Sequence, residues 1–218
     1  MAVRPPGFGP VGADLRGRAR DQLLDTALRL FVERGYVGVR VEDIAKAAGI
    51  SRATFYKHFS EREEILAELF ARLLGREPVA APPGPPADAL PRIRELLIGA
   101  ATRMVTNEQL ARFVYTLPIR HAALLGQGAR PPVLEVVERM IEEGAAAGAI
   151  RADIPAALIT AHIARTFEAA MRDWAEGRAA DAAPHVALLL DLAFEGVEAA
   201  PQQTRGHAAG RVLPGPSQ

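Results

Sequence analysis

The apolar residues of this chain recur at helical spacing along almost its whole length, and no segment of useful length alternates as a β-strand would. Apolar residues make up 49% of the 218 residues and aromatic residues only 6%, so Ala, Leu, Val and Ile supply most of the apolar surface. Ala and Leu favour helices over sheets. The pattern therefore predicts an all-α protein.

Both ends of the chain are rich in Pro, Gly and small polar residues, and we interpret residues 1–14 and 201–218 as disordered arms. Several closely spaced prolines predict a linker at 76–91, which is either a flexible hinge or packs against the domain that follows. This division leaves a small helical domain at 15–75 and a larger helical domain at 92–200.

Apolar spacing, capping residues and the positions of Gly and Pro predict the individual helices. One starts after Ser60, with Glu63 completing a capping box, and Pro118 should kink or split another. The remaining expected ranges are 16–34, 41–48, 51–59, 92–106, 108–125, 131–148, 155–177 and 184–199.

Charge is distributed unevenly, although the formal net charge is zero. Residues 1–62 carry 11 basic and 7 acidic side chains, a net charge of +4, whereas residues 63–200 carry 13 and 19, a net charge of −6. The chain has no cysteine, which excludes disulfides and thiolate metal sites. Without a secretory signal or an apolar run of membrane-spanning length, we expect a cytoplasmic protein that does not enter the membrane.

Two short helical segments, Val41–Ala48 and Ser51–Phe59, are separated by Gly49 and Ile50. Two helices joined by a tight turn with glycine fit the helix-turn-helix, whose second helix lies in the major groove of DNA. Apolar residues at the remaining positions would lock the helices together: Ile44, Ala45, Ala48, Ile50, Phe55 and Phe59. The same spacing also fits an ordinary helical corner with a solvated charged face.

The residues left exposed on the second helix have side chains suited to DNA. Arg bonds the guanine edge, Thr contacts the thymine methyl group, and Lys, Tyr, His and Ser hold phosphates. The exposed set is Arg52, Thr54, Tyr56, Lys57 and His58.

The segment GYVGVRVEDIAKAAGISRATFYKHFSEREEIL, from Gly35 to Leu66, resembles the signature of the TetR family of repressors. The likeness covers about the first third of the chain. It implies an N-terminal three-helix helix-turn-helix domain and a larger C-terminal helical domain for ligand binding and dimerisation. The residues that carry the likeness are Gly35-Tyr36, Ile44-Ala45, Ala48-Gly49-Ile50-Ser51, Thr54-Phe55-Tyr56-Lys57-His58-Phe59, Glu63 and Leu66.

Residue by residue, the resemblance implies phosphate contacts from Ser51, Tyr56, His58 and Arg62, with Lys46 as a weaker candidate. It implies base contacts from Arg52, Thr54 and Lys57. Arg62 stands where the family usually has a lysine, an exchange that keeps the charge.

Two positions depart from the family pattern. Arg40 replaces a threonine that commonly caps the first helix of the motif, so a cap is lost; Asp43 favours the positive helix end, and Arg40 can still reach a phosphate. Ala53 replaces a usual glycine.

The resemblance further implies a homodimer through the last two helices and an unidentified small-molecule effector inside the C-terminal domain. Both helices that would pair have residues at helical spacing, although an ordinary monomeric core would show the same pattern. On the first they are Leu158, Ala161, His162, Arg165 and Ala169, with Phe167 and Met171 on the flanks, and on the second Leu188, Leu189, Leu192 and Phe194. Polar or aromatic side chains along the expected pocket helices are the candidate ligand contacts, although each also has an ordinary structural interpretation. They are Arg103, Tyr115, His121, His162, Arg165 and Trp174.

A helical-bundle enzyme is the main alternative, but its metal-binding patterns are missing. The chain has no Glu-x-x-His, no His-Glu-x-x-His and no pair of His four residues apart, so we expect no metal, no cofactor and no enzyme. A DNA-binding protein without a ligand is the other alternative. The expected function is therefore a regulator that binds operator DNA and releases it on binding its effector, with activation in place of repression left open.

Overall fold

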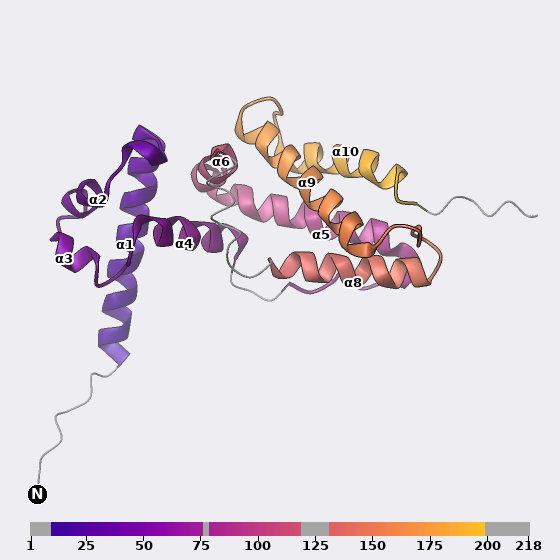
Figure 1. Cartoon of the computed structure of the whole chain (residues 1–218), viewed down its shortest axis with the longest axis horizontal. Helices are drawn as coiled ribbons and strands as arrows, with labels where there is room; N and C mark the ends of the chain where they lie inside the picture. Colours follow the sequence, from indigo (N-terminus) through magenta and orange to yellow (C-terminus); the bar gives the residue numbers. More distant parts are fainter. Residues whose placement is uncertain (1–9, 76–78, 119–130, 199–218) are drawn as a thin grey trace, which may run out of the picture.

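The computed structural model describes residues 10–75, 79–118 and 131–198, with side chains from residue 17 onward. The described residues form helices, turns and one isolated antiparallel bridge between Ile150 and Glu198. Two helical domains follow one another along the long axis (Figure 1). The predicted all-α fold, with a small N-terminal and a larger C-terminal domain, is confirmed.

The N-terminal domain packs three short segments and α4 against a long first helix. In Figure 1, α2 and α3 lie on one side of α1, and α4 leads from α1 toward the second domain. The elements are α1 (Pro10–Arg34), the 3-10 turn η1 (Tyr36–Gly38), α2 (Val41–Ala47), α3 (Arg52–Phe55) and α4 (Arg62–Leu74).

The C-terminal domain is built around α9, which packs against α6, α8 and α10, while α5 packs against α8 and α10. Its elements are η2 (Pro86–Asp88), α5 (Ala89–Met104), η3 (Val105–Asn107), α6 (Glu108–Thr116), α8 (Pro132–Ala146), α9 (Ala156–Ala175) and α10 (Ala182–Glu195).

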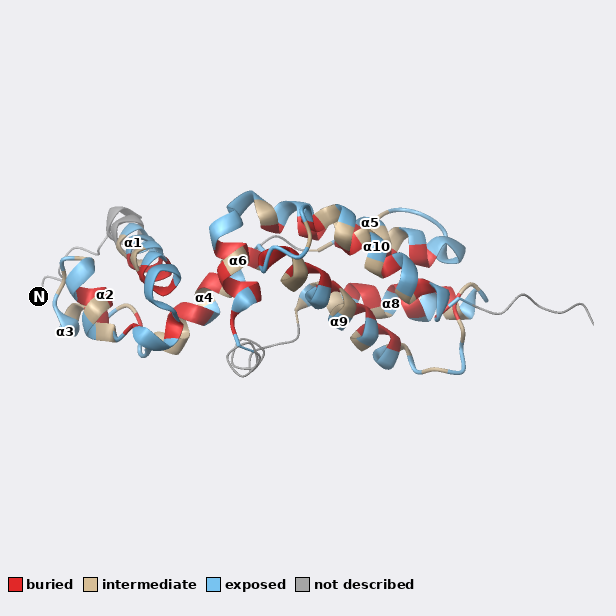
Figure 2. Cartoon of the chain, turned by 90° about the horizontal axis from the view of Figure 1, so that it is seen from above, coloured by how far each residue is buried: buried red, intermediate tan, exposed pale blue. Residues whose placement is uncertain are grey.

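Each domain has an apolar core on the inner faces of its helices (Figure 2). In the N-terminal domain α1 packs against α4, and Leu24 and Phe31 of α1 and Ile65 of α4 are fully buried. In the C-terminal domain Ile141 of α8 and Met171 of α9 are fully buried. These positions follow the helical spacing of the sequence, so burial of apolar surface stabilises the predicted helices.

Several helix boundaries differ from the predicted ones for identifiable reasons. The first helix begins at Pro10 instead of residue 16, since proline suits the first helical position. The fifth begins at Ala89, because Pro91 lies in the first turn, where its missing N–H would have no partner in the helix. The sixth ends at Thr116, before Pro118, and Leu117 is extended, as expected for the residue before a proline.

The proline-rich segment packs against the C-terminal domain. The Arg92 guanidinium on α5 donates hydrogen bonds to the carbonyl oxygens of Pro82 and Pro85, at 2.8 and 3.3 Å. Of the two possibilities that the sequence left open, a hinge or a packed segment, the described part of this segment therefore forms the packed one.

No helix in the described ranges is both long enough and apolar enough to span a membrane.

Candidate nucleic-acid interface

The turn between α2 and α3 sets the angle between these helices. Gly49 has a φ of +68°, a backbone conformation that costs glycine little because it has no Cβ. The next N–H, of Ile50, donates to the carbonyl oxygen of Ala45 at 3.0 Å. Ser51 then caps α3, its side-chain oxygen accepting a hydrogen bond from the Thr54 N–H at 3.1 Å. The predicted helix-turn-helix and its Ser51 cap are therefore present.

The inner face of this motif is apolar. Ile44, Phe55 and Phe59 are fully buried, and the two phenylalanine rings have centroids 5.9 Å apart. Regular α-helix in α3 covers only Arg52–Phe55, less than the predicted 51–59, and turns continue the chain to Phe59. Such a short helix has little stability of its own, so packing on its inner face holds it in place.

The outer face of α3 and of the turns that follow it carries the side chains predicted to meet DNA. Arg52, Tyr56 and Lys57 are exposed, whereas Thr54 and His58 are partly buried. The Arg52 Nη1 atom lies 3.1 Å from Glu42 Oε1 on α2, and its Nη2 donates to the Tyr56 hydroxyl at 3.4 Å. These contacts hold Arg52 across the outer face of the motif.

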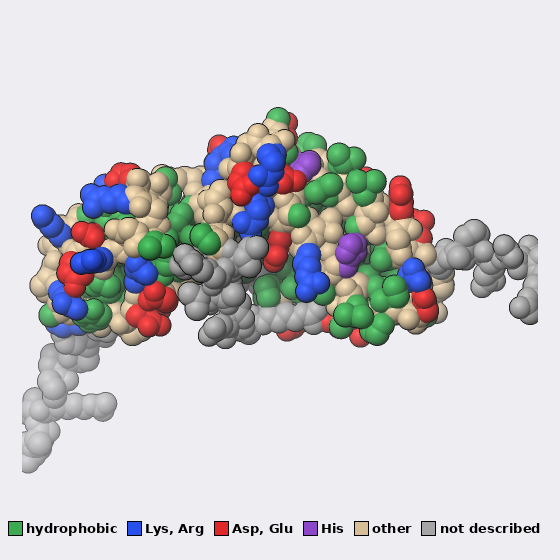
Figure 3. Space-filling view, turned by 45° about the horizontal axis from the view of Figure 1, so that its top comes forward, with side chains coloured by type: hydrophobic (Ala, Val, Ile, Leu, Met, Phe, Trp, Pro, Cys, Tyr) green, Lys and Arg blue, Asp and Glu red, His purple; other side chains and the backbone are tan. Residues whose placement is uncertain are grey.

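A shallow depression of about 350 Å³ brings together four of the predicted residues from different parts of the domain: Arg40, Arg52, Tyr56 and Arg62. The depression is also lined by Glu42, Glu61 and Glu63, so its surface carries charges of both signs. A phosphate there would compete with Glu42 for the Arg52 guanidinium. Ser51 and Lys46 are also exposed but do not line the depression. Basic and acidic side chains are interspersed at this end of the molecule in Figure 3.

The Asp43 carboxylate replaces the cap that is lost at Arg40. The backbone N–H of Arg40 donates to the Asp43 carboxylate at 2.9 Å, which satisfies one amide at the start of α2. The Arg40 residue stays exposed, so its side chain is not needed for the cap.

The Arg62 side chain is engaged within the protein. Its guanidinium donates to the carbonyl oxygens of Tyr36 and Val39, at 3.2 and 2.7 Å, and lies 4.2 Å from the centroid of the Tyr36 ring. These contacts tie the start of α4 to the segment that leads into α2. The phosphate contact implied by the resemblance stays a prediction, and the side chain has a structural task beside it.

The prediction of a capping box between Ser60 and Glu63 is wrong, because the partner of Ser60 is Glu64. Both the N–H and the hydroxyl of Ser60 donate to Glu64, at 2.7 and 3.0 Å, because α4 starts at Arg62, one residue after its N-cap Glu61. Glu63 instead accepts the hydrogen bond of the Tyr36 hydroxyl at 3.0 Å. Burial, together with this bond, raises the pKa of Tyr36 to about 12, so the hydroxyl keeps its proton.

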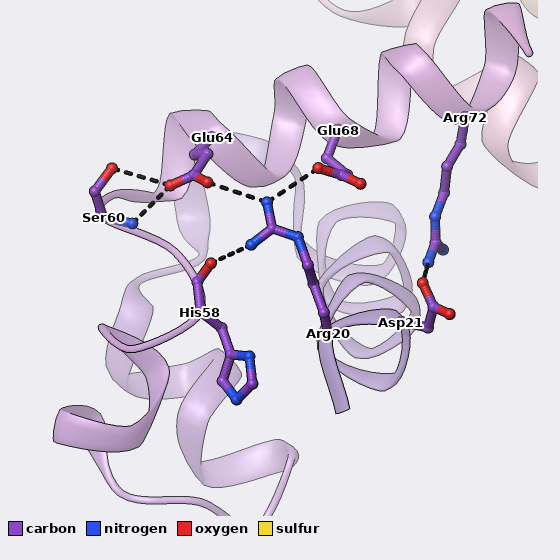
Figure 4. Close-up of polar contacts among 7 residues, drawn as sticks. All are labelled: Arg20, Asp21, His58, Ser60, Glu64, Glu68 and Arg72. Atoms are coloured by element: carbon purple, nitrogen blue, oxygen red, sulfur yellow. Dashed lines mark hydrogen bonds and ion pairs between the residues drawn. The ribbon is translucent and has the colours of Figure 1, made fainter. Parts of the chain in front are cut away.

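Arg20, which the sequence analysis did not single out, joins α1 to α3 and α4 (Figure 4). Its guanidinium donates to the carbonyl oxygen of His58, directly after α3. It also binds Glu64 and Glu68 on α4, at 3.1 and 3.0 Å, and lies 4.1 Å from the centroid of the Phe59 ring. The Arg20 side chain thus joins the end of the segment Ser51–Phe59, here called the recognition segment, to α4.

The sequence does contain a signal for Arg20. It lies four residues before Leu24, on the stripe that continues through Leu28 and Phe31, so it is a charged residue on the buried face of α1. A charge at such a position needs a partner from another element. The sequence did not identify that partner, because α4 is distant along the chain.

Glu64 receives hydrogen bonds from two directions. Burial opposes its ionisation, but the hydrogen bonds from the Ser60 N–H and from Arg20 outweigh burial and lower the pKa of Glu64. The carboxylate is therefore ionised at neutral pH, when it binds Arg20.

The structure does not bring the predicted ligand contacts together. Tyr115 is buried and lines a cavity between α4, α5, α6, α8 and α9. Trp174 is buried beneath the Arg112 guanidinium, which lies 4.4 Å from the centroid of its ring. The other described candidates, Arg103, His162 and Arg165, are exposed and do not line this cavity, and His121 lies outside the described residues.

Comparison with known proteins agrees with this geometry. The profile of the family described as "Bacterial regulatory proteins, tetR family" matches residues 23–69. The transcriptional regulator AcrR of Shigella flexneri is 33% identical over 93 residues, covering 41% of this chain and 43% of that protein. The chain thus spans less than half the length of this curated relative.

Solved structures extend the likeness to the whole fold. NalD, the secondary repressor of the MexAB-OprM multidrug efflux pump in Pseudomonas aeruginosa, has a TM-score of 0.61 and 17% identity, over 85% of this chain and 98% of that one. FadR of Thermus thermophilus, a repressor solved with lauroyl-CoA, has a TM-score of 0.53 and 22% identity, over 91% and 100%. Residues 23–69 thus match the model of the TetR family, and the chain shares the fold of these two regulators.

Proposed function

We propose that this protein is a transcriptional repressor that binds operator DNA as a homodimer and releases it when a small molecule enters the C-terminal domain. The observation that carries the proposal is the outer face of α3, where Arg52, Tyr56 and Lys57 are exposed together on a helix-turn-helix. The family match at residues 23–69 covers this motif. Such a face suits base contacts from Arg52 and phosphate contacts from its neighbours.

An exposed apolar surface on the last two helices supports the homodimer. Leu158 of α9 and Leu188 and Leu192 of α10 have exposed fractions of 62%, 56% and 59%. Hydrophobic side chains also gather on the visible face of the C-terminal domain in Figure 3. Pairing α9 and α10 with the same helices of a second copy would bury these leucines in a four-helix bundle.

The contacts of α4 support a route from effector to DNA. Phe70 and Leu74 line the cavity of the C-terminal domain, while Glu64 and Glu68, which lie earlier on the same helix, bind Arg20. A ligand that shifts α4 would therefore also shift the recognition segment. Half-site spacing on DNA is fixed by the helical repeat, so a small shift would weaken both halves of a dimer at once.

The fold is also that of a structure solved with a small molecule, the FadR–lauroyl-CoA complex. The relatives compared are regulators and not enzymes, which supports a regulator that acts on DNA in the cytoplasm. The effector-binding and dimerisation domain would comprise residues 92–200, with the DNA-binding domain at 15–75.

The test is specific DNA binding by the full chain. Duplexes selected from a random library, together with the region upstream of its own gene, are titrated in a mobility-shift assay. We expect specific binding that falls about tenfold or more for Arg52→Ala, in line with about 1–3 kcal/mol for a good base contact. Tyr56→Ala should also weaken binding, because it removes a phosphate contact. Arg29→Ala, an exposed change on α1, is the matched control. Failure to select any preferred sequence would refute the proposal.

A further inference from the structure

The cavity in the C-terminal domain has an almost wholly apolar wall. It lies between α4, α5, α6, α8 and α9 and has a volume of about 80 Å³. Pockets for drug-sized ligands measure roughly 300–1,000 Å³, so this cavity in its present form suits a small group or a short chain. The aromatic rings of Phe70, Tyr115 and Phe167 contribute to its wall.

One of the two polar groups at the cavity is the Tyr115 hydroxyl. Tyr115 is buried, and its hydroxyl donates to the Met104 sulfur at 3.3 Å. A thioether is a weak acceptor. No described residue donates a hydrogen bond to the hydroxyl oxygen. The oxygen is thus available to accept a hydrogen bond from a ligand in the cavity.

The other polar group is Glu168, the one charged residue among the described residues of the wall. The residue is exposed, so it lies at the mouth of the cavity and keeps its hydration. None of the described basic side chains forms an ion pair with it. Tyr115 and Glu168 line the same cavity; burial raises the pKa of Tyr115, and the negative charge of Glu168 raises it further.

This combination of groups selects for ligand charge. Glu168 and the Tyr115 oxygen both accept hydrogen bonds, so they favour a ligand that donates. The carboxylate repels an anion, and aromatic rings such as Phe70 and Phe167 attract a cation toward their faces. The apolar wall offers nothing to a second polar group and stabilises a hydrocarbon chain by burying it.

We propose that the cavity binds a small lipophilic ammonium ion, with its nitrogen at Glu168 and Tyr115 and its hydrocarbon chain against the apolar wall. The assignment rests on the proposed function for its regulatory meaning, since an effector must enter the C-terminal domain to act on α4. The binding itself is independent of DNA.

The experiment measures binding to the full chain without DNA. The probe is n-butylammonium at pH 7.5, and butan-1-ol and butyrate are the neutral and anionic probes of matched length. We expect the dissociation constant of butylammonium to be at least tenfold lower than that of butan-1-ol, and butyrate to bind more weakly than both. Equal binding of the three, tighter binding of butyrate, or no butylammonium binding up to 50 mM would overturn the proposal.

Variants locate the site. Glu168→Gln should remove most of the preference for butylammonium over butan-1-ol, and Tyr115→Phe should weaken butylammonium binding about threefold. Ala164→Leu places extra carbon atoms in the cavity and should abolish binding of the amine and the alcohol alike. A preference that survives Glu168→Gln, or binding that survives Ala164→Leu, contradicts the assignment.

Matched controls keep the interpretation independent of folding. Glu142→Gln on α8 and Ala169→Leu on α9 are exposed positions outside the cavity wall and should leave all three dissociation constants unchanged. Operator affinity is then measured with and without butylammonium. Charge-selective binding without operator binding would refute the repressor proposal and support the ammonium site. Operator binding without charge-selective binding would refute the ammonium site and support the repressor proposal.

Discussion

The Phe31 ring of α1 stacks on the Phe113 ring of α6, with centroids 5.7 Å apart and planes inclined by 13°. The Tyr36 ring meets Phe31 edge to face at 5.1 Å, and its hydroxyl donates to Glu63 of α4. Offset and edge-to-face pairs of this kind are favourable. A row of three rings therefore joins the C-terminal domain to the segment that leads into the helix-turn-helix.

Phe113→Ala should destabilise the protein by about 3 kcal/mol, because Phe113 is buried and its removal leaves a cavity beside Phe31. Urea unfolding followed by circular dichroism measures the change in the free energy of unfolding. Phe113→Leu, which keeps most of the apolar volume, is the control and should lose clearly less. Equal losses for the two variants would contradict this expectation, because they would assign the loss to the ring contact with Phe31 and not to the buried volume.

Arg20→Ala should weaken operator binding about tenfold without altering any side chain on the outer face of α3. The variant loses the hydrogen bond to the His58 carbonyl and both ion pairs to α4, and partly exposed charged contacts of this kind contribute about 0.5–1 kcal/mol each. Fluorescence anisotropy with labelled operator DNA gives the affinity, and Arg29→Ala removes an exposed arginine from the same helix. Equal operator affinities of Arg20→Ala and Arg29→Ala would show that Arg20 does not position α3.

The contribution of Glu64 to stability should disappear in acid. Its pKa is lowered in the folded state, so the stabilisation is fully present above the pKa of an unfolded glutamate, about 4.3, and is lost as the pH falls through the folded value. At pH 7 Glu64→Gln should cost about 0.5–1 kcal/mol, a modest figure because the side chain is partly exposed and screened.

Unfolding of wild type and Glu64→Gln between pH 7 and pH 3 tests this expectation. The two curves of unfolding free energy against pH should converge at the acid end. Glu195→Gln, an exposed change at the end of α10, should follow wild type throughout. A gap between wild type and Glu64→Gln that is constant with pH would mean that the lost interaction is not ionic.

The double variant Leu188→Glu, Leu192→Glu should convert a dimer into a monomer, because it places carboxylates on the apolar surface of α10. Light scattering after size-exclusion chromatography gives the mass. Val32→Glu tests the same kind of change at an exposed apolar position on α1, which has an exposed fraction of 46%, and should leave the dimer intact. A wild-type chain that elutes as a monomer would already contradict the proposed assembly.

Much of the fold was predictable because helical spacing and local capping act over a few residues. Leu24 and Phe31 on α1, the turn at Gly49 and the cap at Ser51 each follow from their near neighbours in the sequence. The same locality explains the errors. The partner of Ser60 depended on whether α4 starts at Arg62, a choice that local residues settle only to within one position.

Contacts between distant segments were outside the reach of the sequence pattern. The link from Arg20 to Glu64, and the arrangement of Tyr115 and Glu168 at one cavity, depend on how helices cross. For the same reason the predicted ligand contacts Arg103, His162 and Arg165 were chosen by chemistry and fall on the exterior. Residue type identified possible ligand groups, whereas their position around a common space required the tertiary structure.

Arg20 binds the main-chain oxygen of residue 58 and not its side chain. The contact that positions α3 is therefore independent of the side chains that face outward for DNA. Every amino acid supplies the same carbonyl there, so the identity of the residue at 58 is irrelevant to the clamp. The outward-facing positions of α3 can therefore be exchanged, in the laboratory or by natural variation, while the scaffold that presents them is retained. A change in the DNA sequence that this protein binds should therefore require substitutions at a few adjacent positions of α3 and none in α1 or α4.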